Sequence, residues 1–183
     1  TTSCRKETRD ICEMNRSEVQ KCPFKDWQTI LTLEEALSKI KNWFPLLFLD
    51  FKTSENPKCK QDIPSLLEQL ATLIQAHHIE SKVIVSSYNQ QFTEQLGTRN
   101  DLLSALDTHH SKDIENLSWS SFSYFMTDHT NFTPTLLEQT QLAGVDAVAY
   151  TVNSASVAKK LKEIWIRFLM TDKLKEIRKA LEK

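Results

Sequence analysis

The chain has 183 residues, of which 40% are hydrophobic and 26% are charged, and its formal net charge is −1. This composition is typical of a globular domain with a substantial core. The near-neutral charge excludes a general attraction to nucleic acid or to anionic lipid, because both require a surplus of Lys and Arg. Apolar runs such as Phe44–Leu49 are far too short to span a bilayer. We therefore expect a single domain over residues 1–183, with no nucleic-acid partner and no transmembrane segment.

The first 30 residues are rich in charge and poor in periodic apolar residues, so we expect residues 1–30 to form an irregular, Cys-containing segment. Cys4, Cys12 and Cys22 lie there, and Cys59 follows. The gaps between them are too wide for a Cys-x-x-Cys metal site. Two interpretations are equally supported: disulfide bonds in a periplasmic or secreted protein, or unrelated thiols in a cytoplasmic one.

The first periodic element begins at Thr32. Thr32 and Glu35 have the spacing of a capping box, and apolar residues then recur at helical spacing as far as Ile40. The apolar run 45–52 comes next, and its length and composition favour a buried strand.

The rest of the chain alternates between expected strands and helices. Further strands are expected at 82–88, 120–126, 147–152 and 166–170, and helical patterns separate them. The polar stretch 98–118 matches neither pattern. One helix followed by five strand–helix units favours a parallel sheet covered by helices. An open doubly wound sheet and five-eighths of a barrel both fit this order.

A pair of charges marks the end of the first expected strand. Side chains two apart on a strand point the same way, so Asp50 and Lys52 share one face. In parallel α/β folds the carboxyl ends of the strands are where active sites form. A carboxylate there can bind a hard cation and an ammonium group can bind phosphate. The alternative is a structural Asp–Lys ion pair, which position alone favours somewhat.

Other strand ends carry weaker signals. Ser86 and Ser87 suit a turn in which Ser bonds the backbone. Tyr150 could line a pocket, although a core aromatic is the more common case. Thr171 and Asp172 suit a helix cap. None of the five histidines has the spacing of a metal motif, and we assign a catalytic role to none of them.

Six segments, taken in order, resemble the glycerophosphodiester phosphodiesterase family. They are Thr1–Thr2 (family Arg-Thr-Thr), Ile30–Leu37 (Ile-Pro-Thr-Leu-Glu-Glu-x-Leu), Leu49–Lys52 (Ile-Glu-Ile-Lys), Val83–Tyr88 (Val-Ile-Ile-Ser-Ser-Phe), Ala149–Asn153 (Val-Trp-Thr-Val-Asn) and Leu169–Asp172 (Ile-Ile-Thr-Asp). Each motif is short, but together they cover nearly the whole chain in the family's order. Leu31 stands in place of Pro, Asp50 in place of Glu and Tyr150 in place of Trp.

The resemblance implies a (β/α)8 TIM-type barrel, of which this chain supplies roughly the last five β/α units. It also implies hydrolysis of a small-molecule glycerophosphodiester to glycerol 3-phosphate and an alcohol, with a divalent cation, Ca²⁺ or Mg²⁺. Under this resemblance Asp50 is a metal ligand, Lys52 lies near the phosphate and Tyr150 contacts the phosphate or the rest of the substrate.

The family's main catalytic motifs have no counterpart in this sequence. These are its His-Arg-Gly motif, its Glu-x-Asp metal pair and its second catalytic His, all of which precede the Arg-Thr-Thr stretch. We therefore expect the chain alone to be inactive and to act with an N-terminal segment of the same domain. Two alternatives stay open: a catalytically inactive barrel that binds a ligand or partner, and an unrelated five-stranded doubly wound domain.

Overall fold

The computed structural model describes residues 11–22, 29–40, 42, 44–52, 59, 62–108 and 121–182. The chain divides into two compact units. The first comprises Thr1–Leu47 and Lys52–Val83, and the second comprises Phe48–Phe51 and Ile84–Lys183.

Short helices with local caps make up the first unit. They are the 3-10 helix η1 (Ile11–Glu13), α1 (Arg16–Gln20), α2 (Leu33–Ile40) and α3 (Ile63–Ala76). The expected capping box of α2 is confirmed, because the Thr32 N–H donates to Glu35 Oε2 at 2.7 Å and the Glu35 N–H donates to Thr32 Oγ1 at 3.2 Å. In α3, Asp62 accepts from the Ser65 N–H at 3.2 Å.

The segment expected to be irregular contains a helix. Asn15 and Glu18 form a reciprocal capping box at the start of α1, with bonds of 2.8 and 3.1 Å. This helix is only five residues long, too short for apolar periodicity to show in the sequence. Residues 1–10 and 23–28 of that segment lie outside the described residues.

A disulfide bond joins Cys12 to Cys59, 47 residues apart, within the first unit. The structure therefore supports the disulfide interpretation for this pair. Cys22 is buried, and its thiol donates to the Glu18 carbonyl at 3.5 Å. Cys4 lies outside the described residues.

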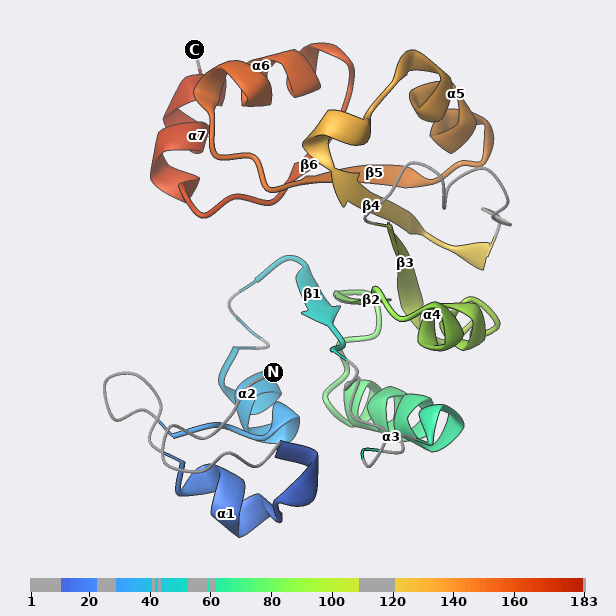
Figure 1. Cartoon of the computed structure of the whole chain (residues 1–183), viewed down its shortest axis with the longest axis vertical. Coiled ribbons are helices and arrows are strands. Elements are labelled where there is room, and N and C mark those ends of the chain that lie inside the picture. The colour runs from blue at the N-terminus through green and yellow to red at the C-terminus, as the bar shows by residue number, and fades with distance from the viewer. Residues whose placement is uncertain are drawn as a thin grey trace. The chain divides into compact units, whose positions relative to one another are not determined.

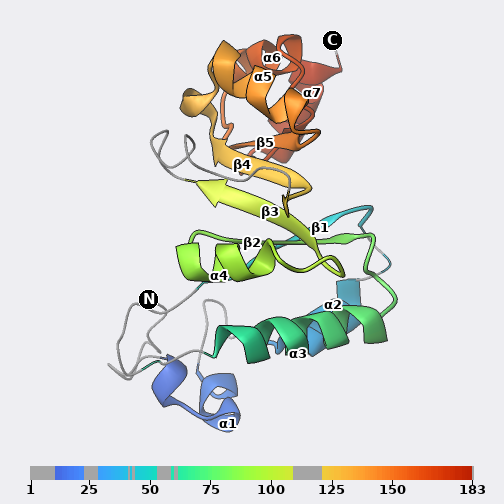
Figure 2. The same cartoon turned by 90° about the vertical axis from the view of Figure 1, so that its right-hand side faces the viewer.

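The second unit is built on a parallel sheet with the order β1-β2-β3-β4-β5-β6 (Figures 1 and 2). The strands are β1 (Leu47–Asp50), β2 (Val83–Ser87), β3 (Leu103–Thr108), β4 (Tyr124–Asp128), β5 (Asp146–Tyr150) and β6 (Phe168–Leu169). Each strand lies beside the next one in the chain. A doubly wound sheet reverses its strand order at a switch point, so this order excludes that alternative and indicates part of a barrel.

The expectation of five strands is corrected to six. The missed strand, β3, lies in the polar stretch 98–118, where Ser104, Asp107 and Thr108 interrupt the apolar pattern. Pairing with β2 and β4 holds it in the sheet. The tertiary setting thus overrides a weak local signal. Residues 109–118 lie outside the described part of the chain.

Helices cover the outer face of the sheet. They are α4 (Gln90–Leu96), α5 (Pro134–Leu142), α6 (Ala155–Glu163) and α7 (Leu174–Leu181), with a 3-10 turn η5 (His129–Asn131) after β4. In both views α5, α6 and α7 lie on the same side of β4 and β5 (Figures 1 and 2). One buried cluster joins Leu106 and Phe125 to Leu136 of α5. These contacts show which face of the sheet is the outer one.

Aromatic contacts identify the inner face. Phe48 of β1 and Tyr124 of β4 have ring centroids 5.8 Å apart, and Tyr124 and Phe168 of β6 have centroids 5.6 Å apart. These strands are not neighbours in the sheet. Their side chains can meet only if the sheet curls around them, because adjacent strands already lie about 4.8 Å apart. The side of Phe48, Tyr124 and Phe168 is therefore the barrel interior.

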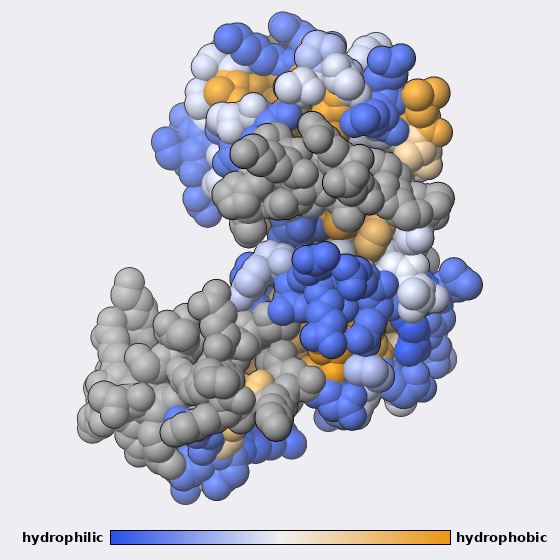
Figure 3. Space-filling view, turned by 45° about the vertical axis from the view of Figure 1, so that its right-hand side comes forward, coloured by the Kyte–Doolittle hydropathy of each residue, from blue (hydrophilic) through white to orange (hydrophobic). Residues whose placement is uncertain are grey.

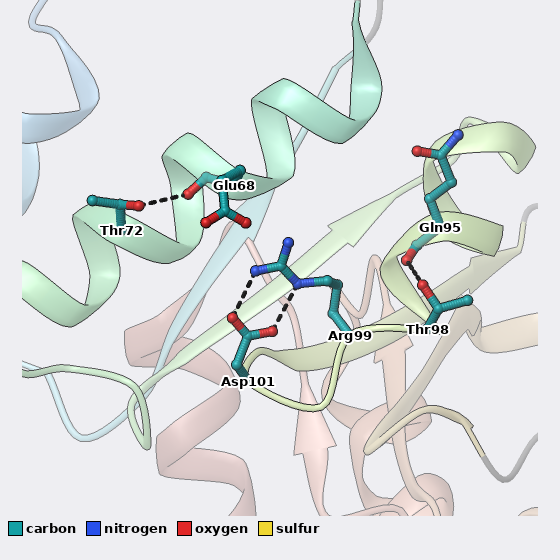
Figure 4. A network of polar contacts seen from close by, with 6 residues as sticks. All are labelled: Glu68, Thr72, Gln95, Thr98, Arg99 and Asp101. Atoms are coloured by element: carbon teal, nitrogen blue, oxygen red, sulfur yellow. Dashed lines mark hydrogen bonds and ion pairs between the residues drawn. The ribbon is translucent and has the colours of Figure 1, made fainter.

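Local hydrogen bonds fix the turn at the amino end of β3. Arg99 donates from Nε and Nη2 to the two carboxylate oxygens of Asp101, both at 2.7 Å, and Thr98 Oγ1 donates to the Gln95 carbonyl at 2.7 Å (Figure 4). In α3, Thr72 Oγ1 donates to the Glu68 carbonyl at 2.9 Å, as the same figure shows. Among the described residues on the face drawn in Figure 3, most are hydrophilic, and small hydrophobic patches lie between them. In the described part of the chain, no helix is long and apolar enough to cross a membrane.

Candidate functional site

Three strands of the second unit carry an aspartate at the carboxyl end. Asp50 is the last residue of β1, Asp128 is the last of β4, and Asp107 is the next to last of β3. Side chains an even number of residues apart on a strand lie on the same face. Asp50 is two residues after Phe48 and Asp128 is four residues after Tyr124, so both lie on the inner face. Asp107 lies there too, because it is two residues after Ala105, the register partner of Tyr124. The carboxylates thus belong to one end of the barrel interior, which we call the mouth.

Tyr150, at the end of β5, joins this group. Its hydroxyl donates to Asp107 Oδ1 at 2.6 Å and lies 3.2 Å from the Thr108 carbonyl oxygen. Asp128 is its register partner on β4. Burial raises the pKa of the Tyr150 hydroxyl well above its ordinary value, and the hydrogen bond to Asp107 and the charges of Asp107, Asp128 and Asp50 raise the pKa further. Tyr150 therefore stays protonated at neutral pH and directs its proton to Asp107.

Asp128 also shapes the loop that follows β4. Its Oδ1 accepts from the Thr130 N–H at 2.8 Å and from Thr130 Oγ1 at 2.6 Å, which caps η5. His129 Nδ1 lies 4.0 Å from the same oxygen. The Asp128 carboxylate is therefore held at the mouth by its own loop.

Ser86 and Ser87 point to opposite faces. Ser87 Oγ donates to the Phe51 carbonyl at 2.7 Å and accepts from the Asn89 N–H at 3.1 Å, so the expectation that it bonds the backbone is confirmed. The same expectation is wrong for Ser86, which lies within strand β2, is fully buried and has no hydrogen-bond partner for its Oγ within the described residues. The Phe51 N–H donates to the Ser86 carbonyl at 2.7 Å, which sets Asp50 beside Ser86 on the inner face.

Polar groups also connect the ends of β5 and β6. Asn153 Oδ1 accepts from Thr171 Oγ1 at 3.1 Å and from the Asp172 N–H at 3.0 Å, and Asn153 Nδ2 donates to Asp172 Oδ2 at 2.9 Å. Thr171 and Asp172 therefore bind the preceding loop, and the N-cap position of α7 is occupied by Lys173, whose side chain makes no capping hydrogen bond. This corrects the expectation that one of them caps the helix.

The predicted site residues fall into two groups. Asp50 and Tyr150 lie at the same mouth, close enough that the Asp50 charge acts on the Tyr150 hydroxyl. Lys52 is exposed, two residues beyond β1, and belongs to the first unit. Its role near a phosphate stays a prediction.

Carboxylate oxygens are the ligands that Ca²⁺ and Mg²⁺ prefer, and Asp50 is an exposed carboxylate at the mouth. Within the described residues, no three side chains of His, Cys, Asp or Glu are arranged to hold a metal ion together. Asp50 can thus supply one carboxylate ligand, and its role in a cation site stays a prediction.

Asp107 and Asp128 were not among the residues that the sequence singled out. A signal exists for Asp128, which like Asp50 ends a largely apolar run, Tyr124–Asp128, whereas Asp107 lies in a strand whose polar residues hide it. Once these runs are assigned as parallel strands, their aspartates come to the same edge of the sheet.

Comparison with known proteins shows which solved structures share this fold. No protein-family model matches the sequence, and no curated protein matches it. Solved structures do match. A glycerophosphodiester phosphodiesterase from Parabacteroides distasonis has a TM-score of 0.75 at 14% identity, covering 92% of this chain and 71% of that one. An Oleispira antarctica phosphodiesterase in complex with sn-glycerol-3-phosphate has a TM-score of 0.73 at 17% identity, covering 91% of this chain and 70% of that one.

The chain has the fold of the glycerophosphodiester phosphodiesterases. The resemblance in the sequence motifs is thereby confirmed at the level of the fold. A third match, a proposed glycerophosphoryl diester phosphodiesterase from Silicibacter pomeroyi, has a TM-score of 0.70 at 14% identity, covering 84% of this chain. This chain spans only 57% of the length of that protein. Identities this low show the phosphodiesterase fold and nothing finer.

Proposed function

We propose that this chain forms part of a metal-dependent phosphodiesterase that hydrolyses glycerophosphodiesters to glycerol 3-phosphate and an alcohol. The observation that carries the proposal is the place of Asp50, on the inner face at the carboxyl end of a strand in a sheet with this fold. One structural neighbour holds sn-glycerol-3-phosphate, which is the product such a reaction would release.

Each predicted residue has a role in this proposal. Asp50 binds the divalent cation, Ca²⁺ or Mg²⁺, with one carboxylate. Lys52 supplies a positive charge for the phosphate, and Tyr150 contacts the substrate at the far side of the mouth. The cation, when bound, would spread the charge that develops on the phosphoryl oxygens.

Hydrolysis transfers the phosphoryl group from the alcohol oxygen to a water oxygen. The water loses a proton to a base, and the leaving alcohol oxygen gains one from an acid. The family's His-Arg-Gly motif and second His have no counterpart in this sequence. We therefore propose that an additional segment of the same domain supplies both histidines, so that these 183 residues alone are inactive.

The test is release of glycerol 3-phosphate from glycerophosphocholine by the complete natural protein, with and without a chelator. We expect activity that the chelator abolishes and added Ca²⁺ or Mg²⁺ restores. Asp50→Asn should lower kcat/KM by roughly 10- to 100-fold, the loss typical when residues that hold or orient a metal site are replaced. Asp146→Asn is the matched control: it removes the same charge at the amino end of β5, where Asp146 faces Arg167, and should leave activity unchanged.

Two results would contradict the proposal. If Asp50→Asn retains full activity, Asp50 is not a metal ligand. If the complete protein has no hydrolytic activity with either cation, the chain is better described as an inactive barrel that binds a ligand or partner.

We further propose that the protein works in an oxidising compartment, either periplasmic or outside the cell. The Cys12–Cys59 bond supports this, because such bonds seldom persist in the cytoplasm. Peptide mapping of the natural protein, alkylated before any reduction, should recover these two cysteines linked. Recovery of both as alkylated thiols would favour the cytoplasmic alternative.

A further inference from the structure

Two neighbouring loops at the amino ends of the strands each expose a large apolar side chain. Leu142 ends α5, shortly before β5, and Trp165 follows α6, shortly before β6. Leu142 is 82% exposed and Trp165 is 81% exposed. The strands β5 and β6 pair in parallel, and Arg167 Nη1 lies 3.5 Å from Asp146 Oδ1, which ties the starts of the two strands together. Both apolar side chains therefore belong to the end of the sheet opposite the mouth.

The backbone at Trp165 does not favour a tryptophan. Its φ is 67°, in the left-handed region that bulky L residues rarely adopt. The residue closes α6, because the Trp165 N–H donates to the Lys162 carbonyl at 3.1 Å and the Ile166 N–H donates to the Leu161 carbonyl at 3.0 Å. Glycine is the usual residue at this position after a helix. The chain follows that rule after α5, where Gly144 has a φ of 70° and the same pattern of hydrogen bonds.

Trp165 thus combines a strained backbone with a large apolar side chain left in water, and glycine would avoid both. The Trp165 side chain makes no hydrogen bond or ring contact to any residue that the structure describes. Packing within the second unit therefore does not account for this tryptophan. A strained, exposed aromatic residue fits a role in contact with another surface.

The surface beside Trp165 is basic. Residues 159–167 contain four basic residues and one acidic residue. One of the four, Arg167, is engaged with Asp146. The other three are exposed and make no ion pair within the described part of the chain: Lys159, Lys160 and Lys162. The net charge of −1 excludes an attraction of the whole chain to anions, but this end of α6 is locally positive.

We propose that the loops 142–146 and 163–167 bind the surface of an anionic lipid bilayer. Tryptophan prefers the membrane–water interface because its ring is amphipathic, and the exposed Leu142 adds a second apolar anchor. The lysines at the end of α6 are attracted to the lipid phosphates. They also favour lipid over a protein partner, because lysine is depleted in protein–protein interfaces. This binding lies at the opposite end of the sheet from the mouth and does not depend on the proposed hydrolysis.

The experiment is co-sedimentation of the complete natural protein with phosphatidylcholine vesicles, with and without phosphatidylglycerol. We expect tighter binding to the vesicles that contain phosphatidylglycerol, and release by salt, because salt screens the attraction of the lysines to lipid. Trp165→Gly and Leu142→Gln should each lower the partition coefficient by roughly tenfold. Leu174→Gln is the matched control: Leu174 is 70% exposed but begins α7, after the carboxyl end of β6, so its loss should leave binding unchanged.

Stability separates a binding role of Trp165 from a structural one. Trp165→Gly places glycine in a conformation that glycine readily adopts, so its urea midpoint should be close to that of the wild type. A clear fall in the midpoint would show that Trp165 packs against another part of the protein, and it would overturn the inference.

Four binding results would also overturn it. They are no binding of the wild type to anionic vesicles, equal binding to neutral ones, unchanged binding by Trp165→Gly, and an equal loss in Leu174→Gln. Sedimentation velocity without lipid tests a second copy of the chain as the occupant. A dimer that Trp165→Gly dissociates, in a protein that ignores vesicles, would assign this surface to self-association instead.

Discussion

Replacing Tyr150 with Phe removes one hydroxyl and keeps the ring, so it isolates the bond between β5 and β3. That hydroxyl donates to Asp107 Oδ1 at 2.6 Å. A hydrogen bond to a charged group contributes about 1.5–3 kcal/mol when well buried. Tyr150 and Asp107 are both partly exposed, so we expect Tyr150→Phe to lower the free energy of unfolding by roughly 1–2 kcal/mol.

Urea denaturation followed by far-UV circular dichroism measures this change. If the free energy of unfolding falls by about 2 kcal/mol per molar urea, the predicted loss of stability lowers the urea concentration at the unfolding midpoint by roughly 0.5–1 M. Tyr124→Phe is the matched control. Tyr124 faces the same interior at the amino end of β4, and its hydroxyl makes no hydrogen bond to any described residue. Its midpoint should stay within error of the wild type. Equal midpoints for all three proteins would show that the Tyr150–Asp107 bond contributes nothing, and the placement of Tyr150 in the mouth would lose its main support.

Two further predictions concern redox state and pH. Cys12→Ser should lower the free energy of unfolding of the first unit by about 4 kcal/mol, which is the loop-closure value for a 47-residue loop. A reducing agent should destabilise the wild type but not this variant. If reduction leaves the stability of the wild type unchanged, the Cys12–Cys59 bond is contradicted. Spectrophotometric titration near 295 nm should show Tyr150 and Tyr124 ionising above the ordinary pKa of 10, because burial raises the pKa of both hydroxyls. Because the pKa of Tyr150 is higher in the folded state, this tyrosine contributes stability below pH 10, and the contribution is lost as the pH rises further. The free energy of unfolding should therefore fall above pH 10 by less in Tyr150→Phe than in the wild type. An equal fall in both proteins would contradict the assignment.

Features set by neighbouring residues could be read from the sequence. The Thr32–Glu35 box depends on a spacing of three residues, and its two hydrogen bonds form as expected. The start of α5 at Thr133 and Pro134 is equally local: Thr133 accepts from the Leu136 N–H at 3.2 Å. Strand β1 was recognisable because its apolar run ends abruptly in Asp50.

Features that depend on residues far apart in the chain could not be read from the sequence. Strand β3 has too many polar residues for periodicity to reveal it, and it exists because β2 and β4 pair with both of its edges. The choice between a barrel and a doubly wound sheet depends on the spatial order of the strands, which no local pattern encodes. The disulfide partner of Cys12 is 47 residues away, and the four cysteines allow three pairings.

The site was predictable only in part for the same reason. The rule that carboxyl ends of parallel strands meet at one edge brings Asp50 and Tyr150 together. It does not reveal that Tyr150 bonds to Asp107, because that contact requires β3 to be known and the sheet to curl. The role of Tyr150 changes accordingly, from a general pocket aromatic to one whose proton is already engaged by a carboxylate.

The most direct test of the central claim is a crystal structure of the complete protein with sn-glycerol 3-phosphate and Ca²⁺. The account predicts that the phosphate lies at the mouth, with the cation bound to the Asp50 carboxylate. A ligand bound on the outer, helix-covered face, or a cation held without Asp50, would contradict it.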